Sequence, residues 1–174
     1  MTSVSITIET ASPKWRRAFV RQQVKIESAA AIAVLRAKKP AALKKRELAI
    51  GITLADNKTI KKLNRAWRGK DTPTNVLSFP QIDCKHLRAG ALTPFPRQKP
   101  LPLGDVILAY ETIQKEAKNQ GKKLEDHVIH LIIHGVLHLF GYDHMSKKDA
   151  KTMEKLECDI LAVLGYPDPY ADPV

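Results

Sequence analysis

Cysteines and long apolar segments are both scarce in this sequence of 174 residues. The two cysteines, Cys84 and Cys158, lie far apart and form no C-x-x-C motif, which excludes a disulfide framework and favours a reducing compartment. The longest uninterrupted apolar run, Ala29 to Leu35, is far shorter than the roughly 18 residues of a membrane span, and residues 1–10 are unlike a secretory signal. We therefore expect a cytoplasmic protein with no membrane partner.

Acidic residues are also few, with 18 Asp and Glu against 29 Lys and Arg and a formal charge of +11. The excess is uneven, because residues 1–55 carry +8, residues 56–126 carry +6 and residues 127–174 carry −3. A field of this sign attracts phosphates and acidic surfaces, nucleic acid included. Because the basic residues are scattered, charge alone does not separate an RNA partner from plain solubility.

The length and the hydrophobic content of 44% fit one packed domain over residues 1–174. Alternation of apolar and polar residues predicts four strands, over residues 4–8, 48–54, 75–79 and 103–109. Helical spacing and capping residues predict five helices, over residues 13–39, 57–67, 110–121, 124–140 and 147–164. We expect an α+β fold, with a single small mixed β-sheet of about four strands layered with about five helices.

Three details of these elements are specific enough to test. Asp56 is a candidate N-cap for the helix over residues 57–67, whose apolar stripe is Ile60, Leu63 and Trp67. Ser146 begins a capping box for the last helix. The proline-rich stretch over residues 81–102 has little periodicity and is predicted to be a mobile loop.

The most informative stretch runs from His134 to His144, with the sequence H-G-V-L-H-L-F-G-Y-D-H. His134 and His138 are four residues apart in a predicted helix, so their imidazoles lie one turn apart on one face and can reach a single cation. Gly141 can adopt the left-handed conformation that ends a helix, which lets His144 approach the same point. Three neutral nitrogens and an open fourth position are typical of a catalytic zinc site. We predict a zincin-like site for one Zn²⁺, or another divalent transition metal, on the central helix.

The alternative is that these are core histidines, each satisfied by a hydrogen bond, but three of them in eleven residues with a glycine at the turn disfavour it. His130 lies one turn before His134 on the same face. We expect it to pack against or support the site, with metal coordination as the lesser alternative, because a fourth protein ligand would close the site. His127 and His86 are expected to be ordinary structural histidines.

The spacing H-x-x-x-H-x-x-G-x-x-H is also that of the metzincin proteases. Those enzymes need a glutamate directly after the first histidine as general base, and this chain has Gly135 there. A peptidase without that base would lose much of its rate. A zinc metallopeptidase is therefore the second hypothesis for function.

Three further blocks accompany the histidine motif. They are L-N-R-A-W-R-G-K-D-T-P-T-N-V-L-S-F-P over residues 63–80, L-G-D-V over residues 103–106 and L-G-Y-P-D-P-Y over residues 164–170. Together with the H-G-x-L-H-L-x-G-Y-D-H motif, they resemble the YbeY family of bacterial endoribonucleases. The resemblance implies a metal-dependent endoribonuclease specific for single-stranded RNA, acting in ribosomal RNA processing, including 3′ end maturation of small-subunit rRNA, and in ribosome quality control.

Carried over residue by residue, the resemblance assigns metal binding to His134, His138 and His144 and a catalytic role to Arg68. The chemistry of arginine agrees with this, since a planar guanidinium can clamp a phosphodiester and stabilise the charge that develops on its oxygens. A solvated or structural arginine is the alternative. Asp143 is a candidate acceptor for a ligand imidazole, and the other weaker candidates are Lys70, Thr74, Ser78 and Asp105.

The expected partners are single-stranded RNA, ribosomal RNA precursors and the ribosome, and not DNA. No obvious carboxylate base accompanies the metal ligands, so the nucleophile is either metal-bound hydroxide or the 2′-OH of the RNA itself. A third hypothesis is a non-catalytic ribosome biogenesis factor in which zinc only holds the fold together.

Overall fold

The structure is a computed structural model that describes residues 3–19, 22–88 and 99–171. A four-stranded sheet runs through these residues in the order β1-β2-β4-β3. Neighbours β1, β2 and β4 are parallel, whereas β3 is antiparallel to β4. The predicted small mixed sheet is therefore confirmed, and its strands are β1 (Val4–Thr10), β2 (Leu48–Ala55), β3 (Val76–Pro80) and β4 (Leu101–Ala109).

Seven α-helices and a 3-10 turn are present in the described part of the chain. They are α1 (Pro13–Phe19), α2 (Gln23–Arg36), the 3-10 turn (Ala41–Leu43), α3 (Asn57–Arg68), α4 (Cys84–Arg88), α5 (Tyr110–Asn119), α6 (Leu124–Leu139) and α7 (Lys147–Val163). The α+β class is confirmed, with two more helices than the five expected. Among the described residues, no helix combines the length and the apolar character that crossing a bilayer requires.

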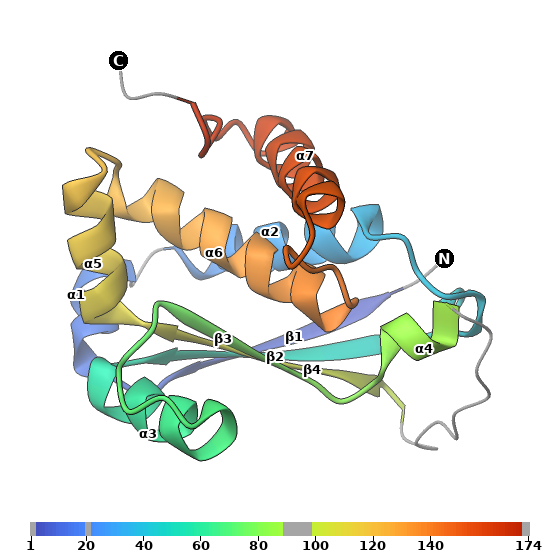
Figure 1. Cartoon of the computed structure of the whole chain (residues 1–174), viewed down its shortest axis with the longest axis horizontal. Helices are drawn as coiled ribbons and strands as arrows, with labels where there is room; N and C mark the ends of the chain where they lie inside the picture. Colours follow the sequence, from blue (N-terminus) through green and yellow to red (C-terminus); the bar gives the residue numbers. More distant parts are fainter. Residues whose placement is uncertain (1–2, 20–21, 89–98, 172–174) are drawn as a thin grey trace.

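The sheet separates two layers of helices (Figure 1). On one face α2 and α6 pack on the strands, and α7 packs on the outer side of α2 and α6. The large apolar core fills the space between them and the sheet. On the opposite face α3 covers a smaller apolar cluster formed by Ile60, Leu77 and Ala109. Central helix α6 is thus held between the sheet and α7, with α2 packed beside it.

The long helix predicted over residues 13–39 is wrong, because it is two helices, α1 and α2. Its apolar stripe is correct, since Trp15, Phe19, Ile26, Ala30 and Ala33 are all buried. The two halves face different neighbours: the Trp15 indole donates to the Ala55 carbonyl, whereas α2 packs across α6. A single straight helix could not make both the contact with Ala55 and the contact with α6.

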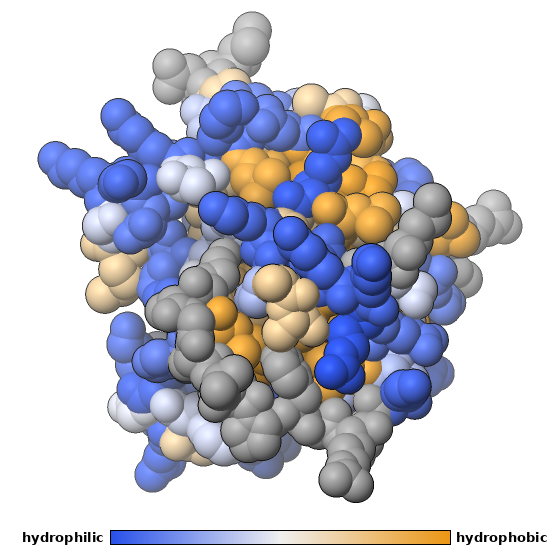
Figure 2. All heavy atoms as spheres, turned by 90° about the vertical axis from the view of Figure 1, so that its right-hand side faces the viewer, coloured by the Kyte–Doolittle hydropathy of each residue, from blue (hydrophilic) through white to orange (hydrophobic). Residues whose placement is uncertain are grey.

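The proline-rich stretch is also more structured than predicted. It contains α4 and the first residues of β4, so a loop over all of residues 81–102 is wrong. Residues 89–98, on which the expected mobility of the loop mainly depends, lie outside the described residues. Figure 2 views the molecule from the side on which α4 lies, and its surface there mixes hydrophilic side chains with apolar patches.

Both predicted caps are confirmed. The Asp56 carboxylate accepts a hydrogen bond from the Thr59 backbone N–H at 2.8 Å, and the Ser146 hydroxyl accepts one from the Asp149 N–H at 3.1 Å. The predicted apolar stripe of α3 is correct at Ile60 and wrong at Trp67, whose side chain is 72% exposed. Trp67 comes one residue before the end of α3, where the only ring in contact with it among the described residues is that of Phe79 on edge strand β3.

Candidate metal centre

Helix α6 places His134 and His138 side by side at the rim of the core. Their Nε2 atoms are 3.0 Å apart, and both side chains are partly exposed while the flanking apolar residues are buried. The helix lies close to the sheet because of Gly135: a Cβ atom built there would come within 2.5 Å of Cγ1 of Val106 on β4. The Ser78 hydroxyl on β3 donates to the Gly135 carbonyl at 2.9 Å, which ties the helix to the edge strand.

The turn after α6 brings His144 back to the other two histidines, as predicted. Gly141 has φ 75°, the left-handed conformation that an L side chain adopts only with strain. The Tyr142 N–H bonds to the Leu137 carbonyl at 3.2 Å and closes the turn. One nitrogen atom from each of His134, His138 and His144 lies within 4.8 Å of the others, so this group can hold a metal ion.

Hydrogen bonds fix the tautomers of the two helical histidines. Nδ1 of His138 donates to the Tyr142 carbonyl at 2.9 Å, and Nδ1 of His134 donates to the Glu157 carboxylate at 2.8 Å. The proton of each neutral ring is therefore on Nδ1, and both Nε2 atoms present lone pairs to one point. Burial, with the neighbouring His134, lowers the pKa of His138 to about 4, so this ring is neutral at pH 7. The two Nε2 atoms are 3.0 Å apart and their lone pairs converge, which fits a cation shared between them.

Glu157 on α7 is the functional residue that sequence reasoning missed. Its carboxylate is fully buried and accepts hydrogen bonds from His134, His130 and the Tyr170 hydroxyl. Burial alone would raise the pKa of this carboxyl, but the hydrogen bonds from His130 and His134 outweigh it and lower the pKa to about 2. A signal was available in the sequence, because Glu157 lies inside the apolar stripe of α7, next to Leu156.

The remaining acid and histidine predictions have different outcomes. Nε2 of His130 donates to Glu157 at 3.0 Å, as expected of a supporting residue, and His130, His134 and Glu157 form a second group of possible ligands that shares His134 with the first. Among the described residues, Asp143 makes no hydrogen bond to the imidazole of a candidate ligand. Asp143 accepts from the His144 backbone N–H and from Lys85, and its oxygen is 4.0 Å from the His144 ring nitrogen. The imidazole of His138 is oriented by the Tyr142 carbonyl, and that of His134 by the Glu157 carboxylate.

The two histidines expected to be structural have acidic partners outside the three-histidine group. His127 lies 2.9 Å from Glu116, and His86 lies 2.5 Å from Asp83. Of the weaker candidates, Lys70, Thr74 and Ser78 line the pocket described below, whereas Asp105 does not and accepts a hydrogen bond from Gln81 at 3.2 Å.

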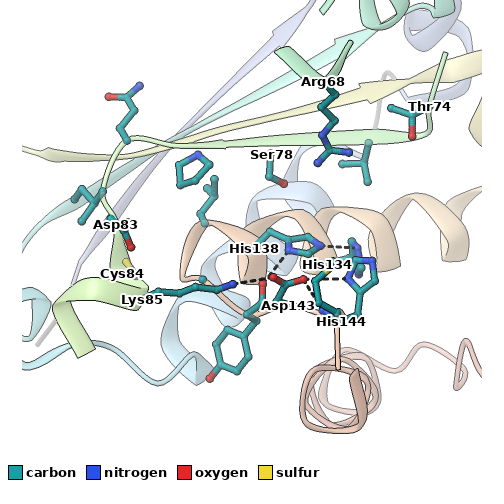
Figure 3. Close-up of a pocket in the computed structure, with 18 of the residues that line it drawn as sticks. Arg68, Thr74, Ser78, Asp83, Cys84, Lys85, His134, His138, Asp143 and His144 are labelled. Atoms are coloured by element: carbon teal, nitrogen blue, oxygen red, sulfur yellow. Dashed lines mark hydrogen bonds and ion pairs between the residues drawn. The ribbon is translucent and has the colours of Figure 1, made fainter. Parts of the chain in front are cut away.

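A pocket of about 1140 Å³ opens in front of the three histidines, between β3, α4 and the turn after α6. Arg68 and Lys70 line it from the end of α3, and Lys85 lines it from α4. Figure 3 shows the Arg68 side chain extending from α3 past Ser78 towards the side on which the histidines lie. Arg68 and Lys70 have no acidic partner within the part of the chain that the structure describes. Cationic side chains and candidate metal ligands therefore share one cavity.

Fold and site together define a class: an α+β protein whose central helix and following turn carry a three-histidine group able to hold a metal ion, beside a cationic pocket. Comparison with known families makes the assignment specific. The family model described as endoribonuclease YbeY matches residues 16–165. The chain belongs to the YbeY family.

Curated relatives agree over nearly the whole chain. A protein named endoribonuclease YbeY from Paramagnetospirillum magneticum is 44% identical over 170 residues, 98% of each chain, and one from Sinorhizobium medicae is 40% identical over 175 residues, 99% of this chain and 98% of the relative. A solution structure of a Thermotoga maritima protein matches 96% of this chain and 99% of its own with a TM-score of 0.54. At 20% identity, that structure supports the fold alone.

Proposed function

We propose that this chain is a zinc-dependent endoribonuclease that cleaves single-stranded segments of ribosomal RNA precursors in the cytoplasm. Membership of the YbeY family assigns it endoribonuclease activity and a role in rRNA processing. We further propose that it acts on the 3′ end of small-subunit rRNA, associates with the ribosome and takes part in ribosome quality control. Residues 1–174 would work as one domain, since the described residues share one sheet and one main core.

The observation that carries this proposal is the position of Arg68 and the three histidines around one pocket. His134, His138 and His144 would hold a zinc ion, for which an all-nitrogen donor set with an open side is suited, although nickel, cobalt or iron fit the same donors. When bound, such an ion supplies Lewis-acid polarisation of a phosphoryl oxygen and lowers the pKa of water. Tyr142 and Glu157 keep the donor nitrogens deprotonated and aimed at the ion.

Arg68 would bind the phosphodiester that is cleaved. Its exposed guanidinium can donate two parallel hydrogen bonds to the phosphate oxygens and stabilise the additional charge of the transition state. Lys70, on the same side of the pocket, adds a second positive charge without a fixed geometry. Lys85 is less free, because its ammonium group is 2.7 Å from the Asp143 carboxylate. Arg68 is thus the cation that we assign to catalysis.

The metallopeptidase hypothesis conflicts with the packing of α6. A glutamate at position 135 would have to fit where even a Cβ atom lies 2.5 Å from Val106 and 3.2 Å from the Ser78 hydroxyl. The general base of the metzincins therefore has no room at this position. The carboxylates among the described pocket residues, Asp83 and Asp143, are both engaged by other side chains.

Metal analysis combined with a cleavage assay on single-stranded RNA tests the proposal. We expect Arg68→Ala to keep its metal and to lose about 10²- to 10³-fold in rate, the typical cost of removing one stabilising donor. His138→Ala should remain folded but lose both metal and activity. Arg16→Ala is the control, because Arg16 is an exposed arginine of α1 that does not line the pocket, and its rate should stay near that of wild type.

Several results would contradict the proposal. Cleavage of RNA that survives complete removal of metal would exclude metal dependence, and cleavage of a peptide library instead of RNA would favour the peptidase. A His138→Ala variant that unfolds would favour a structural ion. The products identify the nucleophile, since a 2′,3′-cyclic phosphate requires attack by the 2′-OH of the RNA and excludes direct attack by water.

A further inference from the structure

Trp67 is a large apolar side chain left in solvent on a helix that is otherwise strongly polar. It is 72% exposed, whereas the other tryptophan of the chain, Trp15, is completely buried. Its ring contacts Phe79 at a centroid distance of 5.9 Å and an interplanar angle of 66°. That contact steadies the indole against β3 but leaves most of the ring uncovered. An exposed indole held in place in this way is available to stack on another planar group.

The surroundings of Trp67 favour a polyanion as the partner. Helix α3 contains no acidic residue, and its five cationic side chains are all exposed: Lys58, Lys61, Lys62, Arg65 and Arg68. Asp71 pairs with two members of this group, at 3.5 Å from Lys61 and 4.0 Å from Arg65. An aromatic platform among cations is the arrangement by which proteins bind single-stranded nucleic acid, because bases stack on the ring and phosphates meet the charges.

Trp67 is also continuous with the candidate active site. The next residue, Arg68, lines the pocket that contains the three histidines, and consecutive Cα atoms are about 3.8 Å apart. Within the described residues, β3 is an edge strand of the sheet. Phe79 and Ser78 are neighbours on this strand: Phe79 contacts Trp67 on the α3 face, and Ser78 lines the pocket on the other. An RNA chain that leaves the pocket therefore reaches Trp67 by passing around the edge of β3.

We infer that Trp67 is a stacking subsite for one unpaired nucleobase of the RNA, next to the phosphate bound by Arg68. This inference rests on the proposed function and makes it more specific, because it gives a physical basis for selecting single-stranded RNA. In a duplex the faces of the bases are covered by their neighbours, so Trp67 has nothing to stack on. The subsite takes a base of any sequence, since each base presents a π face.

Tryptophan fluorescence of the metal-loaded full chain tests the inference directly. The probe is a 2′-O-methyl oligouridylate of about eight nucleotides, whose integrity is checked on a gel after the titration. Stacking on Trp67 should quench its emission, while buried Trp15 supplies a constant background. We expect Trp67→Phe to abolish the quenching but to retain most of the affinity. Trp67→Ala should weaken binding, measured by anisotropy, by about 5- to 150-fold, the equivalent of about 1–3 kcal/mol for one stacked base.

Two controls separate stacking from charge and from general surface effects. An abasic oligonucleotide of the same length has the phosphates without the bases, so Trp67→Ala should not change its affinity. Val24→Ala removes part of a side chain that is 71% exposed on α2, away from the pocket, and should bind the oligouridylate like wild type.

Binding of the oligouridylate without quenching would overturn the inference. So would an equal loss of affinity for the base-bearing and abasic probes in Trp67→Ala, or unchanged binding in that variant. In each of these cases cleavage of single-stranded RNA by the wild type would leave the proposed function intact. A wild-type protein that neither binds nor cleaves single-stranded RNA would instead overturn the proposed function, and the stacking subsite with it.

Discussion

At the scale of single residues, the buried carboxylate of Glu157 has the largest electrostatic consequence for the site. A buried charge is strongly unfavourable unless it is hydrogen-bonded, and Glu157 accepts from two imidazoles and from the Tyr170 hydroxyl. The bond to Nδ1 of His134 leaves Nε2 of that ring free for a cation. Glu157 is thus a positioning residue that acts through His134.

Glu157→Gln tests this role. His134 and His130 donate to different oxygens of Glu157, and an amide has an acceptor oxygen at only one of these two positions. One of the two rings must therefore move its proton to the other ring nitrogen or lose its acceptor, and in His134 either change weakens the hold on the tautomer whose Nε2 is free for a cation. We expect zinc affinity, measured by competition with a chromophoric chelator, to fall about 10- to 100-fold while circular dichroism stays native.

The exposed Glu154 on the same helix provides the control for that measurement, because Glu154→Gln makes the same chemical change away from the histidines. Its zinc affinity should equal that of wild type. Tyr170→Phe removes one donor to Glu157 and leaves both imidazoles in place, so its effect should be smaller than that of Glu157→Gln. Unchanged zinc affinity in Glu157→Gln would contradict the positioning role.

At the scale of elements, α3 depends on its N-cap to present Arg68 and Trp67. The helix has few buried residues, Ile60 and Asn64 among them, so its stability relies more than usual on local interactions such as capping at its N-terminus. Its first turn contains no acidic residue, so the negative charges at the positive end of the helix dipole are the carboxylates of Asp56 and of Glu111, which accepts from the Asn57 N–H at 2.9 Å. The Thr59 N–H, donating to the Asp56 carboxylate, lowers the pKa of that group below its ordinary value of 3.8.

We predict that Asp56→Ala lowers the free energy of unfolding by about 1 kcal/mol at pH 7. Asp56→Asn keeps a capping oxygen and should lose less. Because the folded pKa is depressed, the charge of Asp56 stabilises the native state above pH 4 or so, and this stabilisation disappears as the pH falls through the folded pKa. Urea unfolding at several pH values should therefore show wild type and Asp56→Asn converging in acid. A difference independent of pH would exclude a role for the charge.

The contact between α6 and β4 sets the position of the metal centre relative to the sheet. Gly135→Ala places a Cβ atom 2.5 Å from Val106 Cγ1, a distance that forces the helix or the strand to shift. Alanine would otherwise favour the helix by about 1 kcal/mol, so the sign of the effect shows which influence dominates. We predict a net loss of about 1–3 kcal/mol in the free energy of unfolding.

A double-mutant cycle with Val106→Ala isolates this contact. Removing the Val106 methyl groups opens a cavity but also makes room for the new Cβ atom. Gly135→Ala should therefore cost less in the Val106→Ala background than in wild type, with a coupling of more than about 0.5 kcal/mol. Additive effects in urea unfolding would show that the close approach at Gly135 does not limit the packing of α6.

At the scale of the whole molecule, the pocket joins two parts of the chain with opposite formal charge. Arg68 and Lys70 come from residues 56–126, which carry +6, and the three histidines come from residues 127–174, which carry −3. The first part can attract the RNA backbone, while neutral imidazoles in the second can hold the ion. RNA affinity and metal affinity should consequently respond differently to salt.

We predict that affinity for a single-stranded oligonucleotide falls steeply with salt while zinc occupancy barely changes. If four phosphates are neutralised, the slope of log K against log salt is about −3, and affinity drops about 50-fold between 50 and 200 mM. Anisotropy titrations and metal analysis at matched salt concentrations measure the two quantities. RNA binding that is independent of salt would contradict this prediction and would mean that the net charge of +11 serves solubility alone.

Much of the architecture could be predicted from the sequence, because periodicity reports local structure. The four strands, the cap at Asp56 and the turn at Gly141 all follow from residues within a few positions of one another. The approach of His144 to His134 and His138 was predictable for the same reason, since all three lie in one helix and its turn. The split of the helix predicted over residues 13–39 was not, because it depends on which neighbours α1 and α2 meet.

Residue types and short separations along the chain are enough to predict the class of the fold, the histidine site and membership of the YbeY family. Two features depend on three-dimensional packing instead: Glu157, 23 positions after His134, is the hydrogen-bond acceptor of that ring, and Trp67 lies in solvent beside the pocket. Hydrophobic pattern fixes which face of a helix is apolar, but the packing of elements distant in the chain fixes what that face meets. Helix α3 ends at the edge strand, so its last aromatic residue has little to cover it.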